Sequence, residues 1–442
     1  MLLDFTIKNY KSFRDECVFS MRPAPKQKEL DYSILSERIG RNVYKGLSSA
    51  VVYGPNASGK TNIIGAMDTF KQIVLRGNIR NTDTNDSLNI ASSALELIPN
   101  NTLDKPEPVY VSITFIHKGM LFEYSISMDL GLFLDRDYQR KVLFESLSVN
   151  NTQLFERDDT LHIGDLKDVA SYLVPVYKQN AEGAAALAES SLDEKELFLV
   201  NGFKTMFSPK IAALILEWMD KYFITIYRSD SLRLVRKFTE PKKRSIYIEK
   251  TLQDAAEQFG VNSNGLGYVI DGENEEARLC SIFKEGESQT VIPGEFFESY
   301  GTIRFVNMFP LVLRVLKNGG VLVVDEFDAS IHPMALMEII NLFHNDDLNV
   351  HKAQLIFNSH NPVFLNPNLF RRDEIKFVDR DENTHCSQHY SLSDFGTAGA
   401  GGVRKTDDYM KHYFMDRYGA IKNVDLGSIV ENLLKDDNKE NK

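Results

Sequence analysis

Cysteine, tryptophan and long apolar runs are scarce in this chain of 442 residues. The three cysteines, Cys17, Cys280 and Cys386, are an odd, scattered set without a Cys-x-x-Cys pair. Such usage excludes a disulfide framework and a cysteine-based zinc site, and it fits a reducing cytosol. No apolar run approaches the roughly 20 residues that a membrane span needs, and residues 1–5 lack the basic and apolar regions of a signal peptide. We therefore expect a cytoplasmic protein with no membrane partner.

Positive charge is also in deficit, because 51 Lys and Arg face 62 Asp and Glu, which gives a net charge of −11. This balance argues against a chain that coats nucleic acid over its whole surface, although a local basic patch could still bind a phosphate backbone. The densest basic run lies between Arg228 and Arg244. It is either a solvated face balanced by nearby acids or a surface for nucleic acid or another partner.

One stretch predicts a nucleotide site. It reads GPNASGKT, follows the apolar residues 51–53 and precedes apolar positions at helical spacing, so the P-loop pattern stands in its strand-loop-helix context. Glycines permit the backbone to wrap the β-phosphate, and the following helix aims its positive end at that phosphate. We expect Lys60 to reach the β- and γ-phosphates and Thr61 to bind Mg²⁺. The alternative is a glycine-rich turn that only resembles a P-loop. The residues assigned to the nucleotide are Gly54, Pro55, Asn56, Ala57, Ser58, Gly59, Lys60, Thr61 and Asn62.

A second half of the site is expected far along the chain. Residues 321–324 form an apolar run typical of a strand buried on both faces, and the run ends in Asp325 and Glu326. Adjacent acids at the end of a buried strand are costly unless a cation lies there. We expect Asp325 to bind Mg²⁺ and Glu326 to polarise the attacking water, a role usually worth ~10²–10⁴ in rate. A strand that surfaces into an acidic turn is the alternative.

Further candidates flank the acidic pair. Ser299, Gly301 and Thr302 precede an apolar helical stretch, where a helix N-terminus favours an anion. His360 follows the apolar strand at 354–357 and comes after the acidic pair in the chain. We expect it to contact the γ-phosphate, although a histidine at a strand tip is more often structural when it stands alone.

Together these motifs carry a resemblance. The series IKNYKSF, GPNASGKT, ESYGT, VLVVDEFDASIHP and FNSH resembles the SMC/RecF-like branch of the ABC-type ATPases. The resemblance implies that ATP joins two heads into a homodimer or higher homo-oligomer, because each signature motif reaches the nucleotide of a second subunit. Tyr300 and Pro310 depart from the family pattern and could alter closure, and no glutamine-loop residue is assigned. The roles implied are Walker A for Gly54 to Thr61, the signature motif for Ser299, Gly301 and Thr302, the Walker B acid for Asp325, the catalytic glutamate for Glu326, the D-loop acid for Asp328 and the switch histidine for His360.

The predicted fold class rests on the same family resemblance and on hydrophobic periodicity. We expect an α/β protein, an ABC-type ATPase head with a P-loop sheet, flanking helices, an antiparallel β subdomain and an inserted helical arm. Residues 22–50 read as a connection that leads to the P-loop strand. The expected parts are 1–164 with the P-loop and the antiparallel subdomain, 165–285 as a helical insertion, and 286–442 with the signature, Walker B and switch histidine. The expected antiparallel strands lie near 3–7, 17–21, 109–115, 122–128, 142–149 and 153–156.

The C-terminal part carries a looser resemblance. Residues 374–378, 390–395 and 416–421 are similar to the tail of stand-alone bacterial ATPases of abortive infection and phage defence, the AbiL/RloA-type group, with PARIS AriA-like ATPases as functional cousins. In those systems the ATPase is usually paired with a separately encoded nuclease or Toprim-like effector. The DxD-like pair of Asp379 and Asp381 could imitate a Toprim site within this chain, but a polar turn is favoured because too little chain follows it.

Three functions remain open from the sequence. The leading hypothesis is an ATP-hydrolysing switch in anti-phage defence that senses a trigger, such as a phage protein, and controls a toxic effector. The second is a DNA-repair or chromosome-maintenance clamp, which the net acidity and short arm disfavour. The third is a nucleotide-gated scaffold with negligible turnover. In the first two, Lys60, Glu326 and His360 are the catalytic set.

Overall fold

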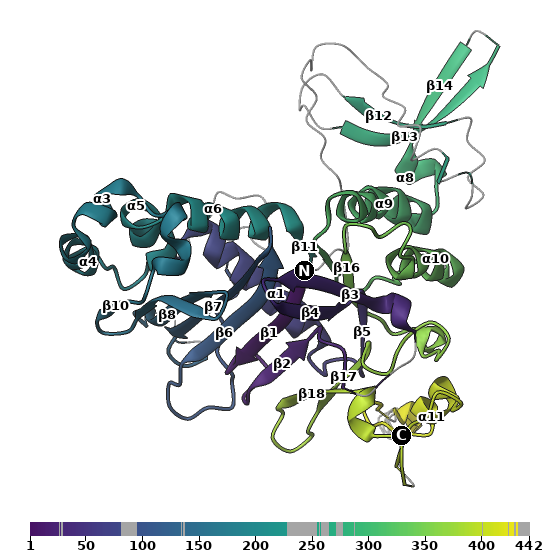
Figure 1. Cartoon of the computed structure of the whole chain (residues 1–442). Coiled ribbons are helices and arrows are strands. Elements are labelled where there is room, and N and C mark those ends of the chain that lie inside the picture. The colour runs from purple at the N-terminus through teal and green to yellow at the C-terminus, as the bar shows by residue number, and fades with distance from the viewer. Residues whose placement is uncertain are drawn as a thin grey trace, which may run out of the picture.

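The computed structural model describes residues 1–25, 27, 30–80, 95–133, 135, 138–227, 254–255, 257, 265–270, 277–286, 288–399, 401–422, 424–427 and 430–431. Two large sheets lie side by side, and a smaller sheet projects beyond them (Figure 1). The expected α/β architecture, with a largely parallel sheet beside an antiparallel one, is confirmed.

The helices begin and end as follows, with η marking 3₁₀ or π turns: η1 Asp31–Ser33, α1 Lys60–Arg76, η2 Lys167–Tyr172, α3 Pro175–Gln179, α4 Ala181–Ser190, η3 Leu199–Phe203, α5 Lys204–Met206, α6 Pro209–Glu217, η4 Trp218–Tyr222, α8 Gly294–Phe297, α9 Tyr300–Asn318, α10 Pro333–His344, η5 Pro362–Phe364, η6 Leu392–Phe395 and α11 Tyr409–Phe414. The strands are β1 Leu2–Lys8, β2 Cys17–Ser20, β3 Ile34–Ile39, β4 Asn42–Leu47, β5 Ser49–Tyr53, β6 Val109–His117, β7 Met120–Asp129, β8 Lys141–Val149, β9 Thr152–Arg157, β10 Leu161–Ile163, β11 Phe223–Ile226, β12 Gly265–Ile270, β13 Ala277–Glu285, β14 Ser288–Pro293, β15 Val321–Val324, β16 Gln354–Asn358, β17 Ile375–Arg380 and β18 Ser387–Ser391.

The central sheet brings the two ends of the chain together. Its order is β11-β15-β16-β5-β17-β18, and all its neighbours are parallel except the antiparallel β17–β18 pair. Along β5, Ala50 and Val52 belong to one hydrophobic core, and Val51 and Tyr53 belong to another. This alternation explains the continuous apolar runs, because a strand covered on both faces needs no polar side. The carboxyl ends of β5, β15 and β16 therefore meet at one edge of the sheet.

The second sheet is antiparallel, with the order β10-β9-β8-β7-β6-β1-β2. The hairpin expected from alternation near residues 3–21 is confirmed, since Phe5 pairs with Phe19 across β1 and β2. The β6–β7 hairpin is also confirmed, with Phe115 opposite Phe122. Helix α1 lies between this sheet and the central one, and its Met67 and Phe70 are fully buried there.

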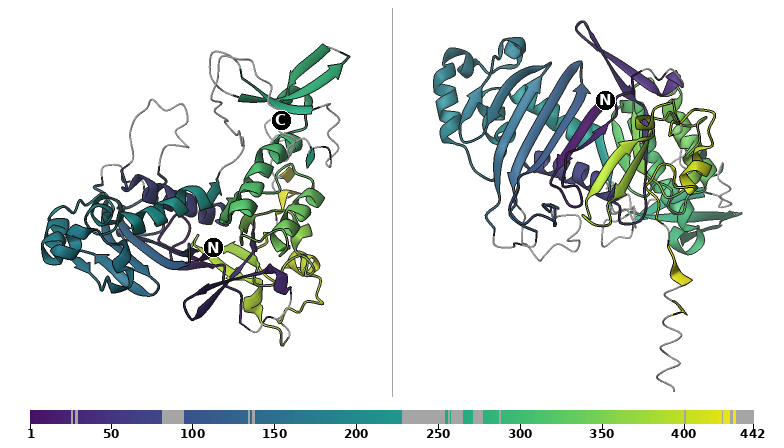
Figure 2. Two further views of the ribbon diagram at one scale, coloured as in Figure 1. Left: turned by 45° about the horizontal axis from the view of Figure 1, so that its top comes forward. Right: turned by 90° about the horizontal axis from the view of Figure 1, so that it is seen from below.

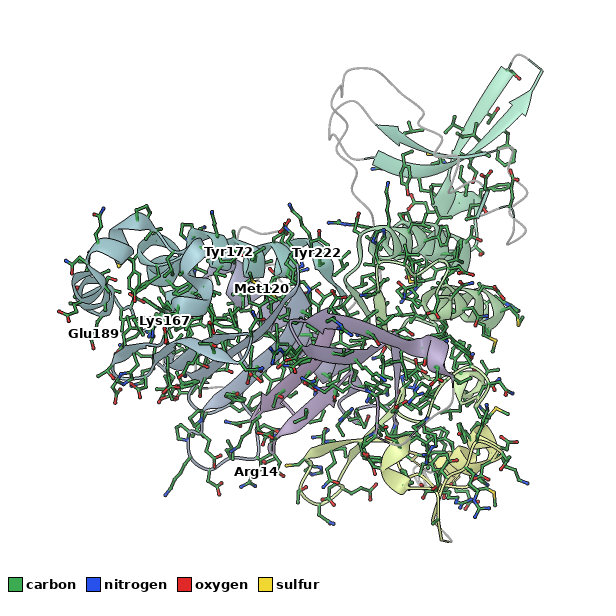
Figure 3. All side chains as sticks on the ribbon, in the orientation of Figure 1. Arg14, Met120, Lys167, Tyr172, Glu189 and Tyr222 are labelled. Carbon is green, nitrogen blue, oxygen red and sulfur yellow. The ribbon has the colours of Figure 1, made fainter. Side chains whose placement is uncertain are left out.

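The helical insertion expected over 165–285 is only partly correct. Helices α3 to α6 cover the antiparallel sheet, and side chains fill the space between them, with Met120, Tyr172 and Tyr222 packed against this core (Figure 3). However, β11 then joins the central sheet beside β15, and residues 265–270 and 277–285 are strands rather than helices. Periodicity could not reveal β11, because four residues are too short to separate a strand from a helix.

A three-stranded sheet of β12, β13 and β14 projects above α8 and α9 (Figure 1). Helix α9 runs from Tyr300 to Asn318 with Pro310 inside it. The connection expected at 22–50 contains a two-stranded ribbon, β3–β4, which the sequence reading had not identified.

Candidate functional site

The loop after β5 has the backbone conformation that its glycines permit. Gly54, Ala57 and Gly59 have φ values of 157°, 64° and 112°. A Cβ on Gly54 would lie 2.2 Å from the carbonyl oxygen of Val378, and one on Gly59 would lie 2.6 Å from Ser387 Oγ. The loop is therefore seated tightly against the β17–β18 hairpin, and only glycine fits at these two positions.

Lys60 folds back over this loop. Its Nζ donates to the carbonyl oxygens of Gly54 at 2.7 Å and Pro55 at 2.9 Å, and the residue is 5% exposed. Burial lowers the pKa of Lys60 to about 8, while the carboxylates of Asp325 and Glu326 act in the opposite direction. An ammonium held by two carbonyl oxygens can exchange them for phosphate oxygens, which are stronger acceptors for it.

Thr61 meets the acid at the end of β15. Its Oγ1 donates to Asp325 Oδ1 at 3.1 Å, and Asn358 Nδ2 donates to the same oxygen at 2.6 Å. Asp325 is 4% exposed and its backbone N–H donates to Ile226 O at 2.8 Å, which anchors it to β11. The structure thus brings together two residues 264 positions apart that the sequence reading assigned to one metal ion.

The residues here fit a metal bound with a phosphate. Ser58 Oγ is buried and has no hydrogen-bond partner among the described residues, so the loop holds a polar atom that a ligand would satisfy. Mg²⁺ usually takes one or two protein oxygens and completes its shell with phosphates and waters. Thr61 and Asp325 supply such oxygens. No cluster of three or more His, Cys, Asp or Glu suited to a metal occurs in the described ranges, and a shell shared with phosphate does not require one.

Glu326 is held in an unusual conformation. Its φ is 51°, in the left-handed region that non-glycine residues rarely adopt. Its backbone N–H donates to Asn358 Oδ1, and its carbonyl oxygen accepts from Arg304 Nη2 at 2.5 Å. Arg304 also reaches Asp325 O at 3.4 Å. These bonds clamp the backbone on both sides, while the Glu326 side chain remains exposed.

Arg304 and Asn358 are functional candidates that the sequence reading missed. Asn358 stands in the FNSH motif beside the switch histidine, so that motif offered a signal. Arg304 is 7% exposed and lies on α9, one turn after the signature residues. The signal available in the sequence was an arginine within the apolar stretch that follows the signature residues. An arginine there predicts a specific partner, because arginine is rarely buried without one.

The turn after β16 is tied to the turn after β15. Asp328 Oδ2 accepts from Ser359 Oγ at 3.0 Å and from the Asn361 backbone N–H at 3.1 Å. Tyr53, the last residue of β5, donates its hydroxyl to Asn361 O at 3.0 Å. Asp328 therefore joins the two turns, and one network links the P-loop strand to the segment that carries His360.

His360 lies at the same edge of the sheet. Its pKa is lowered, mainly by loss of hydration and then by the positive charge of Lys60, while Asp328 and Asp325 oppose the shift. The ring is therefore neutral near pH 7, when its two nitrogens offer one donor and one acceptor.

The signature residues stand apart from the P-loop. Ser299 caps α9, and its Oγ accepts from Thr302 N at 3.1 Å. A Cβ on Gly301 would lie 2.1 Å from Ser330 O, so the start of α9 packs directly on the turn after β15. Ser299 is exposed and Tyr300 is 54% exposed. Within the described part of the chain, no hydrogen bond joins Ser299, Gly301 or Thr302 to residues 54–61.

Further contacts hold the P-loop in place. Asn56 and Ala57 are exposed at the top of the loop, and Asn62 Nδ2 donates to Ser12 Oγ at 2.8 Å. Arg380 Nη1 donates to Ala57 O at 3.4 Å. The β17–β18 hairpin thus supports the loop from outside.

The residues of the Toprim-like alternative, Asp379 and Asp381, lie at the end of β17 and in the turn that leads to β18. Asp381 Oδ1 accepts from the backbone N–H groups of Asn383 at 3.0 Å and Thr384 at 2.6 Å, so it caps a turn. Asp379 accepts from Arg380 N at 2.9 Å. Both carboxylates are engaged by local backbone donors, in keeping with a polar turn.

A comparison of sequence families decides the assignment. The profile described as "AAA domain, putative AbiEii toxin, Type IV TA system" matches residues 49–366, well over half of the chain. The chain belongs to this AAA-domain family. As an AAA-domain chain it is a P-loop ATPase domain with a nucleotide-binding site, and the matched range contains both Lys60 and Glu326.

Two solved structures are similar to this AAA-domain chain. The SMC head domain from Thermotoga maritima is 13% identical, with 88% of this chain and 98% of that chain covered and a TM-score of 0.35. An SMC head bound to the C-winged helix domain of ScpA is 12% identical, with 88% and 97% covered and a TM-score of 0.44. No protein with a curated description matches the AAA-domain chain.

One sequence expectation is not tested by the structure. The basic run between Arg228 and Arg244 lies outside the described residues. Among the described helices, none is long and apolar enough to cross a membrane.

Proposed function

We propose that this chain is an ATP-binding and ATP-hydrolysing molecular switch. The observation that carries the proposal is the meeting of Thr61 and Asp325 at 3.1 Å beside Lys60, with Glu326 next in sequence on the same edge. The phosphate-binding loop, the metal ligands and the general base would then work together at one edge of the sheet, as phosphoryl transfer to water requires.

The chain's own residues would divide the work. The backbone N–H groups of the loop and Lys60 would hold the phosphates, and Thr61 and Asp325 would hold Mg²⁺. Bound Mg²⁺ would neutralise charge on the phosphates. Glu326 would accept a proton from the attacking water, with its backbone fixed by Arg304 and Asn358, and neutral His360 would donate to the γ-phosphate.

A second copy of the chain completes the proposed site. The exposed cap at Ser299 presents backbone N–H groups and a hydroxyl at the start of α9, a helix of 19 residues whose N-terminus favours an anion. Among the described residues no hydrogen bond joins this cap to the P-loop of the same chain, which supports a role in trans. ATP would then hold a homodimer, or a larger homo-oligomer, together.

The biological setting we propose is anti-phage defence by abortive infection. The C-terminal resemblance to AbiL/RloA-type and PARIS AriA-like ATPases supports it, and the family description names a toxin of a type IV toxin–antitoxin system. The switch would sense an invader, such as a phage protein, in the cytoplasm and control a separately encoded effector, a nuclease of Toprim-like or similar kind. The three-part division of the chain at 164 and 285 belongs to this proposal, with β11 counted in the central sheet.

Glu326→Gln tests the proposal. The change removes the base but keeps the shape of the side chain, so phosphate release should fall by at least ~10² and an ATP-bound assembly should accumulate. Glu338→Gln, on the solvent side of α10, is the matched control and should leave turnover unchanged. If phosphate release in Glu326→Gln equals that of the unmodified chain, the hydrolytic role of Glu326 is wrong. Negligible turnover in the unmodified chain would support a nucleotide-gated scaffold instead.

The alternative function, a DNA-repair or chromosome-maintenance clamp, predicts a steep salt dependence of DNA binding. A clamp that grips duplex DNA through six to ten phosphates loses ~10³–10⁵ in affinity between ~50 and ~200 mM salt. A loss of that size would favour the clamp over the switch.

A further inference from the structure

The β3–β4 ribbon has a fixed inner face. Its strands are joined by a two-residue turn, Gly40–Arg41, with φ 57° at Gly40 and Ile39 paired to Asn42. On the inner side, Leu35 is buried with Leu3 and Ile116 in a small separate core, and Ile39 and Tyr44 pack against it. This packing sets which side of the ribbon faces solvent, because side chains alternate along a strand.

The outer face of the ribbon carries positive charge. Arg38 stands opposite Val43, and Ser36 stands opposite Lys45, so Arg38 and Lys45 are diagonal neighbours on one face. Arg41 lies at the turn, and Arg38, Arg41 and Lys45 are all exposed. We call Arg38, Arg41 and Lys45 the cationic ribbon.

Nothing described on the ribbon cancels this charge. Its only acid, Glu37, alternates to the inner face and forms an ion pair with Lys352. None of the three ribbon cations forms an ion pair within the described ranges. The β3–β4 ribbon projects from the body of the molecule (Figure 2). In a chain with a net charge of −11, three exposed cations without an ion pair among the described residues make it a distinct local feature.

A hollow of about 490 Å³ continues this surface. It is lined by Arg22, Pro23 and residues 42–45. Arg22 Nε donates to Asp4 Oδ2 at 2.6 Å, which holds the guanidinium in place beside the ribbon. Asp4 balances the charge of Arg22, so Lys45 is the ribbon cation that brings unbalanced positive charge to this concave surface.

The chemistry of this surface favours a phosphate backbone. A two-stranded ribbon fits the wide groove of a duplex, and arginine and lysine are the usual phosphate ligands. Binding of single strands relies on exposed aromatic rings that stack on bases. The ribbon's aromatic residue, Tyr44, packs against the inner core and is half-buried where it lines the hollow. The outer face itself carries Ser36, Arg38, Val43 and Lys45, so it offers charge without an aromatic ring for stacking.

We propose that the cationic ribbon binds the phosphate backbone of duplex nucleic acid. This contact goes beyond the switch function and does not depend on ATP hydrolysis. It is also separate from the basic run between Arg228 and Arg244. A contact with three phosphates is smaller than the grip of a clamp, and it suits a protein that samples nucleic acid without enclosing it.

The test measures binding of the full chain to a fluorescent duplex DNA by anisotropy over a salt series. With three phosphate contacts the affinity should fall about 40-fold between ~50 and ~200 mM salt. The variant with Arg38→Gln, Arg41→Gln and Lys45→Gln should lose that dependence, and its affinity at ~50 mM salt should fall at least about tenfold. ATP turnover should stay unchanged in this variant, which shows that it is folded.

A matched control separates local contact from net charge. Lys167→Gln, Lys221→Gln and Lys422→Gln remove the same three charges at exposed sites elsewhere, with side chains 88%, 58% and 61% exposed. The control should bind duplex as the unmodified chain does. Equal losses in both variants, or no duplex binding by the unmodified chain, would overturn the proposal.

Two other outcomes would also overturn it. The first is loss of duplex binding only when the run between Arg228 and Arg244 is neutralised. The second is ribbon-dependent binding to phosphatidylserine vesicles in place of the duplex. The ribbon variant tests duplex binding, and Glu326→Gln tests the hydrolytic switch. The two results are independent, so either proposal can fail while the other stands.

Discussion

Replacing Arg304 should separate catalysis from nucleotide binding. Glu326 holds a left-handed backbone conformation that costs ~1–3 kcal/mol unless its surroundings enforce it. The Arg304 bond to Glu326 O, at 2.5 Å, is one of the two bonds that enforce it. A hydrogen bond to a charged donor contributes about 1.5–3 kcal/mol. Because each 1.36 kcal/mol corresponds to a tenfold change in rate, Arg304→Met should lower kcat by about 10- to 150-fold.

The assay is phosphate release under single turnover, together with the dissociation constant of a fluorescent ATP analogue. Arg304 donates to the carbonyl oxygens of Asp325 and Glu326 and so positions the base; nucleotide affinity should therefore change less than about threefold. Arg304→Lys keeps the charge and one donor and should restore part of the rate. Arg314→Met, on the exposed side of the same helix, should behave as the unmodified chain. A normal rate in Arg304→Met, or a loss confined to nucleotide affinity, would refute the positioning role.

Three further predictions follow from the same geometry. Burial lowers the pKa of Lys60 to about 8. The ammonium is therefore fully charged below about pH 7 and loses its charge as the pH rises through 8. Titrations should show a nucleotide affinity that is constant at low pH and falls by up to about tenfold per pH unit above 8. Gly301→Ala would place a Cβ 2.1 Å from Ser330 O, so light scattering should show loss of ATP-dependent association while each chain still binds nucleotide. Tyr53→Phe removes the donor to Asn361 O at 3.0 Å, and denaturant unfolding should show a loss of about 1 kcal/mol with a smaller effect on turnover than Arg304→Met.

The parts of the site that sequence predicted well are those encoded locally. The P-loop needs its glycines, lysine and threonine at fixed spacing, and the apolar run before Asp325 marks a strand buried on both faces. Parallel strands place their carboxyl ends together, so the order of the motifs was enough to predict that Thr61 and Asp325 meet. Their 3.1 Å contact agrees with that expectation.

The missed parts depend on long-range packing. Four residues of β11 carry no distinguishable period, and its place in the sheet is fixed by pairing with β15. Arg304 gains its role only because the start of α9 rests on the turn after β15, a contact between side chain and backbone that spacing does not encode. The β3–β4 ribbon lies in a segment that contains proline and lysine residues, which are typical of a connection. The sequence therefore predicts a connection there, although the short strands alternate.

The most direct measurement is a structure of the full chain with a nonhydrolysable ATP analogue and Mn²⁺, located by its anomalous signal. The account predicts one metal between Thr61 Oγ1 and Asp325, Lys60 on the phosphates, Glu326 facing the γ-phosphate and Ser299 of a second copy closing the site. An analogue bound away from Lys60, or a metal that does not contact Asp325, would contradict it.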